Sequence, residues 1–300
     1  MMTSPSETID AAAAGTWKLG DLTVNRIGFG AMRLTQDGAA FSRGSSSDRT
    51  RATAVLRRAL ELGVNHLDTA SFYFSPLRSA NELINSALAP YADDLVITTK
   101  VGPGRDPSGR WLWATPEQLR GQVEENLRQL GRDHLDVVNL RIARSHGSQS
   151  VLEHFGALAE LRDAGLIRHL GISNTTPEQL AEALSIAPVV CVQNRYGVDA
   201  PPEQHELMRS CGEQGIAFVP FYSITANGQE GGGVDTGNDA LLTVARTHGA
   251  TPAQVRLAWT LHQGAHVLAI PGTGNPDHLA ENVAAGALRL TAEDLALLSA

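Results

Sequence analysis

Short apolar runs alternate with amphipathic stretches along most of the chain. Each run is followed by a polar residue, a loop, and a stretch whose apolar residues recur at helical spacing. Runs that are apolar almost throughout indicate parallel strands with helices covering the sheet. We identify about eight of them, the number that a closed barrel of alternating strands and helices needs. They span residues 27–30, 65–70, 95–100, 135–141, 169–174, 189–194, 216–222 and 267–270.

Three of the predicted helices begin with the same local signal. It occurs at Thr115-Pro116-Glu117-Gln118, again unchanged from Thr176, and from Thr251 with alanine in place of the glutamate. The threonine can cap the helix, proline suits the first helical position, and the glutamine can bond back to the capping residue. The signal therefore predicts helices that begin directly after residues 115, 176 and 251.

The pattern predicts an α/β fold, a (β/α)8 TIM barrel with a short N-terminal β-hairpin. About eight strand–helix pairs follow one another without a break in composition. We expect residues 16–300 to form this single barrel and residues 1–15 to be a flexible tail. The hairpin is predicted from residues 16–19 and 23–26, which flank Gly20-Asp21. A doubly wound open sheet is the alternative, but no G-x-G-x-x-G follows the first strand.

Composition narrows the functional classes. The 300 residues carry a net charge of −8, and 42% of them are hydrophobic. An acidic chain is unsuited to non-specific binding of nucleic acid. No apolar run approaches the about 20 residues of a membrane span. Cys191 and Cys211 are the only cysteines, which suits a reducing compartment. We expect a soluble cytoplasmic protein without nucleic-acid or membrane partners, present as a monomer or weak homo-oligomer.

Polar residues stand at the C-terminal ends of nearly all the predicted strands. In a barrel these ends meet around one mouth, where the active site lies. Singly, each residue has a structural explanation, such as a turn cap for Asp68 or a solvated amine for Lys100. Together they favour an active site, and the lack of clustered histidines predicts no metal. The residues are Asp68, Tyr73, Lys100, Arg141, Ser173, Asn174, Gln193 and Tyr222. Three loops, 102–110, 143–150 and 227–238, follow such strand ends.

Several motifs in order resemble the aldo-keto reductase family, over a stretch from about Thr16 to Leu298. Asp68-Thr69-Ala70 with Tyr73 is similar to the family's Asp-Thr-Ala-x-x-Tyr block. Lys100 is similar to its strand-three lysine, and segment 136–141 most resembles bacterial reductases that include pyridoxal reductases (pyridoxine 4-dehydrogenases). The remaining similarities are in segments 171–174, 192–194, 221–223 and 270–273 and at Leu279, Glu281 and Asn282.

The resemblance implies an NADP(H)-dependent oxidoreductase that reduces a small carbonyl substrate, an aldehyde or ketone, to an alcohol. Pyridoxal is the leading candidate. Tyr73 would donate the proton, and Lys100 would lower its pKa from the ordinary value of about 10. Asp68 would pair with Lys100, and Arg141 would orient the substrate. A nicotinamide-binding sensor or regulatory subunit with little turnover is the alternative function, and a metal hydrolase is a weaker one.

The resemblance also implies which residues hold the cofactor. Ser173, Asn174 and Gln193 would hydrogen-bond the nicotinamide carboxamide, and Tyr222 would stack on the nicotinamide ring. A structural role would also explain the first three residues: a helix cap for Ser173 and Asn174, and a hydrogen bond in the barrel interior for Gln193. The full set is Gly30, Met32, Ser173, Asn174, Gln193, Tyr222, Ser223, Thr273, His278, Glu281 and Asn282.

Two positions depart from the family pattern. Arg141 stands where the family usually has a histidine; its guanidinium is always charged and donates through a planar fork. Gly272 and His278 stand where many relatives carry a lysine and an arginine that bind the 2′-phosphate. Thr273 and the free N–H groups of the following helix can still receive a phosphate. We therefore expect NADPH to be preferred over NADH.

Overall fold

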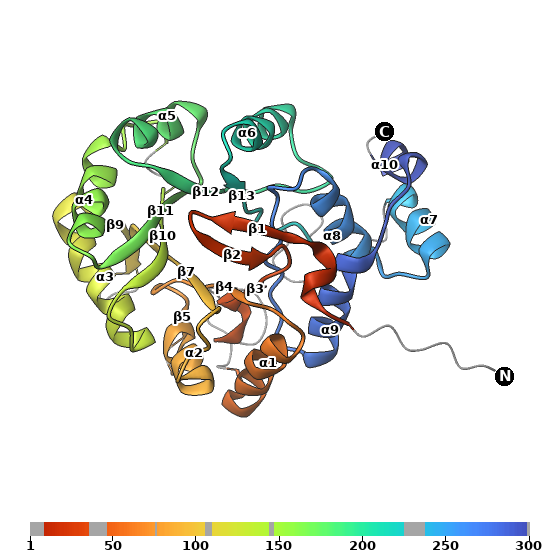
Figure 1. Cartoon of the computed structure of the whole chain (residues 1–300), viewed down its shortest axis with the longest axis horizontal. Helices are drawn as coiled ribbons and strands as arrows, with labels where there is room; N and C mark the ends of the chain where they lie inside the picture. The colour runs from red at the N-terminus through yellow and green to blue at the C-terminus, as the bar shows by residue number, and fades with distance from the viewer. Residues whose placement is uncertain are drawn as a thin grey trace.

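A parallel sheet of seven strands forms the centre of the molecule. The computed structural model describes residues 9–35, 47–75, 77–105, 110–143, 147–224 and 238–298. The strand order is β13-β12-β11-β10-β7-β4-β3, and the sheet curls into a ring, as Figure 1 shows. The strands are β3 (Phe29–Gly30), β4 (His66–Asp68), β7 (Val96–Val101), β10 (Leu135–Arg141), β11 (Ile167–Ser173), β12 (Val189–Gln193) and β13 (Ala217–Phe218).

Segment 266–270 closes the ring between the two edge strands. Phe218 pairs in parallel with Val267, and Ile27 pairs in parallel with Ala269. The backbone N–H groups of Phe218 and Ala269 donate across these contacts at 2.9 and 2.8 Å. The predicted (β/α)8 barrel is confirmed, with the eighth strand position held by isolated bridges. Most of the predicted run 216–222 lies outside β13, which keeps only Ala217–Phe218.

Helices surround the sheet on its outer face (Figure 1). The capping boxes predicted at Thr115, Thr176 and Thr251 are all present. The helices are α1 (Arg49–Glu61), α2 (Ala80–Leu88), α3 (Pro116–Leu130), α4 (Leu152–Asp163), α5 (Pro177–Ile186), α6 (Pro202–Glu213), α7 (Asp239–His248), α8 (Pro252–His262), α9 (Pro276–Ala284) and α10 (Ala292–Leu298). In the described ranges no helix is both long and apolar enough to span a membrane.

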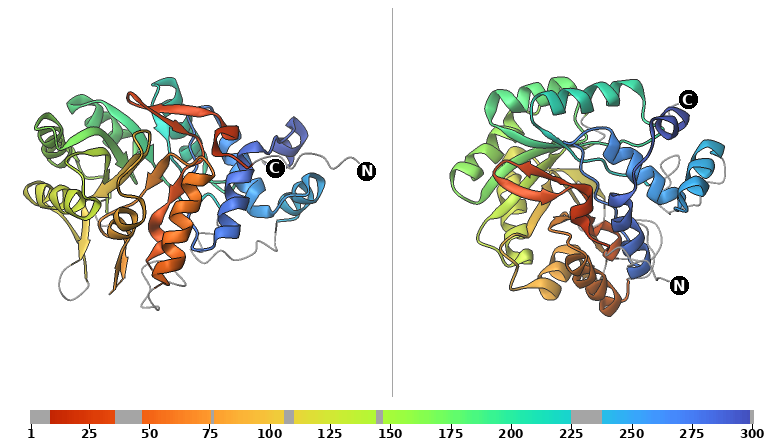
Figure 2. Two further views of the ribbon diagram at one scale, coloured as in Figure 1. Left: turned by 60° about the horizontal axis from the view of Figure 1, so that its bottom comes forward. Right: turned by 45° about the vertical axis from the view of Figure 1, so that its right-hand side comes forward.

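The N-terminal hairpin covers one end of the barrel. Strands β1 (Thr16–Leu19) and β2 (Leu22–Asn25) pair antiparallel, which confirms the predicted hairpin. Leu19 and Val24 are buried and pack with Val137 and Leu268 of the barrel interior. In Figure 2 (left) the hairpin lies at the end away from two further hairpins. These are β5 (Phe74–Ser75) with β6 (Arg78–Ser79), and β8 (Pro103–Arg105) with β9 (Trp111–Trp113).

Two expectations about irregular segments need correction. The flexible tail was expected to reach residue 15, but Ala11–Ala14 form a 3-10 helix. Ala11 is fully buried and donates its N–H to Leu62 O at 2.8 Å, so folded structure begins before residue 11; residues 1–8 lie outside the described residues. Segment 102–110 was predicted as a loop, but its first part pairs with β9. Loops 143–150 and 227–238 lie partly outside the described residues.

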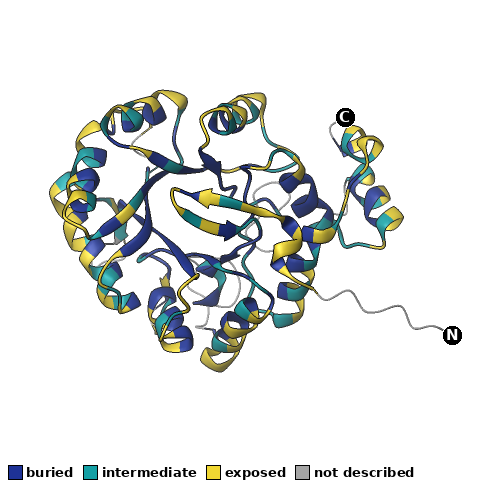
Figure 3. Ribbon diagram, in the orientation of Figure 1, coloured by how far each residue is buried: buried dark blue, intermediate teal, exposed yellow. Residues whose placement is uncertain are grey.

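The strands are buried on both faces, as the dark ring in Figure 3 shows. Alternate side chains point to opposite faces of a strand. One set faces the helices, and Leu67 and Val138 are examples that lie in the main hydrophobic core. The other set fills the interior, and it is apolar near the hairpin, where Val96 and Val137 pack together. Towards the open end the inward set becomes polar, with His66, Asp68 and Lys100.

Candidate active site

A cavity of about 210 Å³ lies at the C-terminal ends of the barrel strands. The N-terminal hairpin covers the other end of the barrel (Figure 2). Nine of the residues predicted from the sequence line the cavity because the carboxyl ends of parallel strands meet there. They are Gly30, Met32, Asp68, Tyr73, Lys100, Arg141, Gln193, Tyr222 and Ser223.

Asp68 and Lys100 form a buried ion pair in the cavity wall. Lys100 Nζ lies 2.5 Å from Asp68 Oδ1, and both side chains are at most 5% exposed. Lys100 also donates to Thr69 O at 3.0 Å, and Gln193 Nε2 donates to Asp68 Oδ2 at 2.7 Å. Both carboxylate oxygens are therefore engaged. Burial alone would lower the pKa of Lys100, but the Asp68 charge, the Tyr73 side chain and their hydrogen bonds raise it overall, so the ammonium stays charged.

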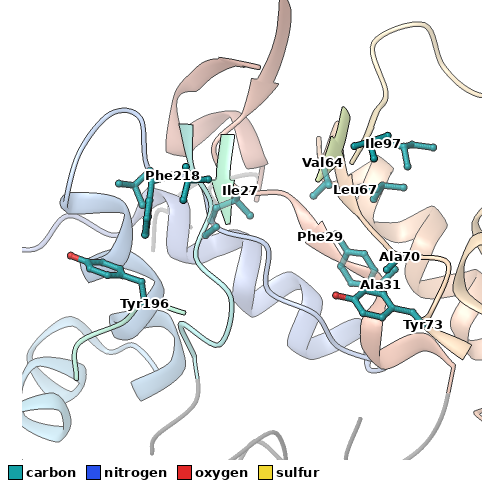
Figure 4. Close-up of a cluster of buried hydrophobic side chains, with 14 of the residues drawn as sticks. Ile27, Phe29, Ala31, Val64, Leu67, Ala70, Tyr73, Ile97, Tyr196 and Phe218 are labelled. Atoms are coloured by element: carbon teal, nitrogen blue, oxygen red, sulfur yellow. The ribbon is translucent and has the colours of Figure 1, made fainter. Parts of the chain in front are cut away.

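Tyr73 lies beside this pair, in the loop that follows β4. Lys100 Nζ lies 4.8 Å from the ring centroid and hydrogen-bonds the Tyr73 side chain. The ring packs among buried apolar side chains near Phe29 and Ala31 (Figure 4). The Tyr73 backbone is fixed at both ends, because its N–H donates to Ala70 O at 3.0 Å and its carbonyl accepts from Ala80 N at 2.9 Å.

Lys100 lowers the pKa of Tyr73 as expected, but the net shift is upward. Burial raises the pKa of Tyr73 above its ordinary value, and the opposing effect of the Lys100 charge is smaller. The desolvation penalty of a buried phenolate is larger here than its electrostatic stabilisation by the neighbouring ammonium. Tyr73 therefore holds its proton throughout the neutral range. That is the protonation state a proton donor needs, and Lys100 limits the rise rather than reversing it.

Arg141 reaches the cavity from the end of β10. One guanidinium nitrogen donates to Ser173 Oγ at 3.1 Å, and Cζ lies 4.6 Å from the Phe221 ring centroid. Ser173 Oγ in turn donates to Gln193 O at 2.8 Å. The Arg141 charge also lowers the Tyr73 pKa by a small amount, which places the guanidinium near the phenol. Ser173 thus supports Arg141 from behind the cavity wall.

The other predicted cofactor residues lie away from the cavity lining. Asn174 adopts a positive φ of 59° and donates to Ile142 O at 3.0 Å. Thr273 Oγ1 accepts from Asn275 N at 3.0 Å, just before α9. His278, Glu281 and Asn282 belong to α9 itself. The described residues include no group of three His, Cys, Asp or Glu side chains arranged as metal ligands would be.

One feature of the cavity fits a nicotinamide cofactor. Gln193 Oε1 is buried and has no hydrogen-bond partner among the described residues, so it can accept from the N–H₂ of a carboxamide. At the adjoining edge, Gly30 and Gly272 allow the backbones of β3 and segment 270–272 to pack closely, because a Cβ on Gly272 would lie 2.5 Å from Gly30 O.

Sequence reasoning missed several residues of the cavity wall. Arg33 lines the cavity, and its Nη1 is buried without a hydrogen-bond partner in the part of the chain that the structure describes. It lies next to Gly272, whose Cβ position would be 3.7 Å from Arg33 Cγ. The only feature of the sequence that could have indicated Arg33 was its position shortly after the first predicted strand. Phe72 and Ile224 also line the cavity, and together with Phe221 of the predicted segment 221–223 they make its wall largely apolar.

Comparisons with known proteins show which family the chain belongs to. The model of the Aldo/keto reductase family matches residues 26–300. Pyridoxine 4-dehydrogenase of Escherichia coli is 43% identical over 95% of this chain and 98% of its own length. An uncharacterized oxidoreductase of Schizosaccharomyces pombe is 36% identical over 99% and 92%.

Two solved structures show the same fold. The thermostable aldo-keto reductase Tm1743, in complex with the inhibitor epalrestat, is 28% identical with a TM-score of 0.78, covering 95% of this chain and 98% of its own. An aldo-keto reductase of Klebsiella pneumoniae in complex with NADPH is 25% identical with a TM-score of 0.74, over 92% and 90%. This chain belongs to the aldo/keto reductase family. It is an oxidoreductase that reduces carbonyl groups of small molecules with NADP(H).

Proposed function

We propose that this enzyme reduces pyridoxal, or a small aromatic aldehyde like it, to the alcohol and that it prefers NADPH. The placement of Tyr73 against the buried Asp68–Lys100 pair, inside a cavity with aromatic walls, carries the proposal. The 43% identity to pyridoxine 4-dehydrogenase of Escherichia coli supports the choice of substrate. Phe72 and Phe221 offer apolar surfaces that suit a flat ring.

Tyr73 serves as the general acid in this proposal. A bound nicotinamide supplies the hydride that the carbonyl carbon receives. Tyr73 gives its phenolic proton to the carbonyl oxygen, and the Lys100 ammonium stabilises the phenolate left behind. Asp68 keeps Lys100 charged and fixes its direction through the 2.5 Å contact. Arg141 donates hydrogen bonds to the substrate, in a direction set by Ser173 and Phe221.

The cofactor is held along the cavity edge. Gln193 Oε1 would accept from the carboxamide because no donor among the described residues reaches it, with Ser173 and Asn174 behind it. Tyr222, which has a positive φ of 63°, would stack on the nicotinamide ring. Gly30, Met32 and Ser223 line the cavity and would border the cofactor, and Thr273, His278, Glu281 and Asn282 would receive its adenosine end.

Arg33 supports the preference for NADPH. Its guanidinium has a buried, unpartnered nitrogen beside Gly272, where many relatives have a lysine. A cation there favours a doubly charged phosphate more than a ribose hydroxyl. Replacing Arg33 with glutamine should therefore lower kcat/KM for NADPH by about tenfold and leave that for NADH within about twofold. An equal loss of kcat/KM with both cofactors would show that Arg33 does not contribute to the preference for NADPH.

The function is tested by following NADPH absorbance with pyridoxal, 4-nitrobenzaldehyde and an aliphatic aldehyde. We expect the aromatic aldehydes to have the higher kcat/KM and Arg141→Ala to lower it most for pyridoxal. The ring hydroxyl of pyridoxal lies next to its aldehyde and ionises readily, so a fixed guanidinium can bind it. Tight NADPH binding without turnover of any aldehyde would favour a cofactor-binding sensor instead.

A further inference from the structure

The backbone ladder between β4 and β7 ends just before the active site. Its register pairs Asp68 with Thr98, and its last hydrogen bond runs from Thr69 N to Thr98 O at 2.8 Å. Lys100 lies beyond that bond, where the chain after β4 turns away towards Tyr73. The position of Lys100 relative to Asp68 and Tyr73 is therefore not set by pairing of these two strands.

A buried chain of side-chain hydrogen bonds continues the connection on the outer face of the barrel. Thr69 Oγ1 donates to Asn81 Oδ1 of α2 at 2.8 Å. Asn81 Nδ2 donates to Asn126 Oδ1 of α3 at 2.9 Å, and Thr99 Oγ1 donates to the same oxygen at 2.6 Å. All four side chains are fully buried. The chain joins the residue after Asp68 to the residue before Lys100 through two helices.

Asn126 is the junction of this chain. Its Oδ1 accepts two hydrogen bonds, and its Nδ2 donates to Gln122 O at 2.8 Å, which fixes the direction of the amide. One turn earlier on α3, Gln122 Oε1 accepts from Gly102 N at 2.6 Å. Helix α3 therefore holds β7 on both sides of Lys100, at Thr99 and at Gly102. Because buried polar groups without partners are costly, this arrangement is strongly preferred over a shifted one.

We propose that Asn126 is a positioning residue that sets the distance from Lys100 to Tyr73 and Asp68. The inference rests on the proposed roles of Tyr73 and Lys100. Without Asn126 Oδ1, the Thr99 hydroxyl and the Asn81 amide lose their partner. The pairing of β7 with β10 still holds Lys100 on one side, but β7 can then shift by a fraction of an ångström relative to the chain after β4. A misplacement of about 1 Å can lower a catalytic rate about 100-fold.

The test compares Asn126→Ala with Asn85→Ala. Asn85 Nδ2 donates to Gln129 O at 3.2 Å, so the control removes a bond between the same two helices that touches neither strand. We expect Asn126→Ala to lower kcat by about 10- to 100-fold and to change the KM for NADPH by less than about twofold. Asn85→Ala should keep the wild-type kcat. An unchanged kcat in folded Asn126→Ala, or equal losses in both variants, would overturn the proposal.

Two further variants exclude a merely structural role. Thr99→Val removes one hydroxyl at nearly constant volume and should lower kcat in the same direction, while Thr99→Ser restores it. In a Lys100→Met background, Asn126→Ala should cause little further loss, because the two residues act through one group. A full additional loss there would contradict the proposal. A wild-type enzyme that reduces no aldehyde would contradict the proposed function itself, which separates the two failures.

Discussion

The buried Asp68–Lys100 pair allows stability and catalysis to be tested separately. The two charged atoms lie 2.5 Å apart, with side chains at most 5% exposed. Coulomb attraction at that distance is about 7 kcal/mol for an effective dielectric constant of about 20. Desolvation offsets much of this, and breaking a buried pair from one side typically costs about 3–5 kcal/mol. Asp68→Asn should therefore lower the free energy of unfolding by about 3–5 kcal/mol, and Lys100→Met should lower it by a similar amount.

The double variant Asp68→Asn, Lys100→Met should recover most of this loss because it leaves no uncompensated charge. It should nevertheless keep only a small residual activity, because Tyr73 then lacks its neighbouring ammonium. Urea unfolding followed by circular dichroism at pH 7 gives the stabilities, and NADPH oxidation gives the activities. Losses that simply add in the double variant would refute the argument that the pair is coupled. Wild-type activity in any of the three variants would refute the role of the charge.

Three further results are expected. Because burial raises the pKa of Tyr73, kcat/KM for reduction should stay level from neutral pH to about pH 9 and fall only above that; a fall centred near pH 7 would contradict this. Burial lowers the pKa of His66 to about 4, below its value of about 6.5 in the unfolded chain. The free energy of unfolding should therefore be at its maximum above pH 6.5 and drop by about 2–3 kcal/mol by pH 4.5, because only the unfolded chain binds the proton in that range. Urea midpoints measure this, and His66→Gln should lack the drop. Gly272→Ala would place a Cβ 2.5 Å from Gly30 O, and it should raise the KM for NADPH about tenfold. The control Gly274→Ala, with no contact closer than 3.8 Å, should not.

The sequence predicted what depends on local pattern and on strand direction. The apolar runs and the Thr-Pro-x-Gln caps placed strands and helices, and the barrel geometry then brought Asp68, Lys100 and Arg141 to one mouth. Pairing between distant segments was not predictable, because nothing local distinguishes the β8–β9 hairpin from a loop. The same holds for the 3-10 helix at Ala11–Ala14, which depends on a contact with Leu62.

Features that depend on the burial of a side chain could not be predicted from the sequence either. The sign of the Tyr73 pKa shift follows from a balance between desolvation and the Lys100 charge, and a sequence gives the charge without the burial. Asn126 is a buried polar residue within an amphipathic helix, where a polar side chain usually indicates the solvent face. The proposed role of Arg33 depends on its proximity to Gly272, a residue distant in the sequence, so it could not be predicted from local pattern.

The transfer of label from deuterated NADPH to the substrate tests the central claim most directly. The enzyme would be mixed with pyridoxal and NADPH deuterated at the transferring position of C4, and the alcohol analysed by mass spectrometry. The account predicts one deuterium on the carbinol carbon with the wild-type enzyme. With Tyr73→Phe it predicts almost no product, although NADPH still binds. Product formed at the wild-type rate by Tyr73→Phe, or alcohol without deuterium, would contradict it.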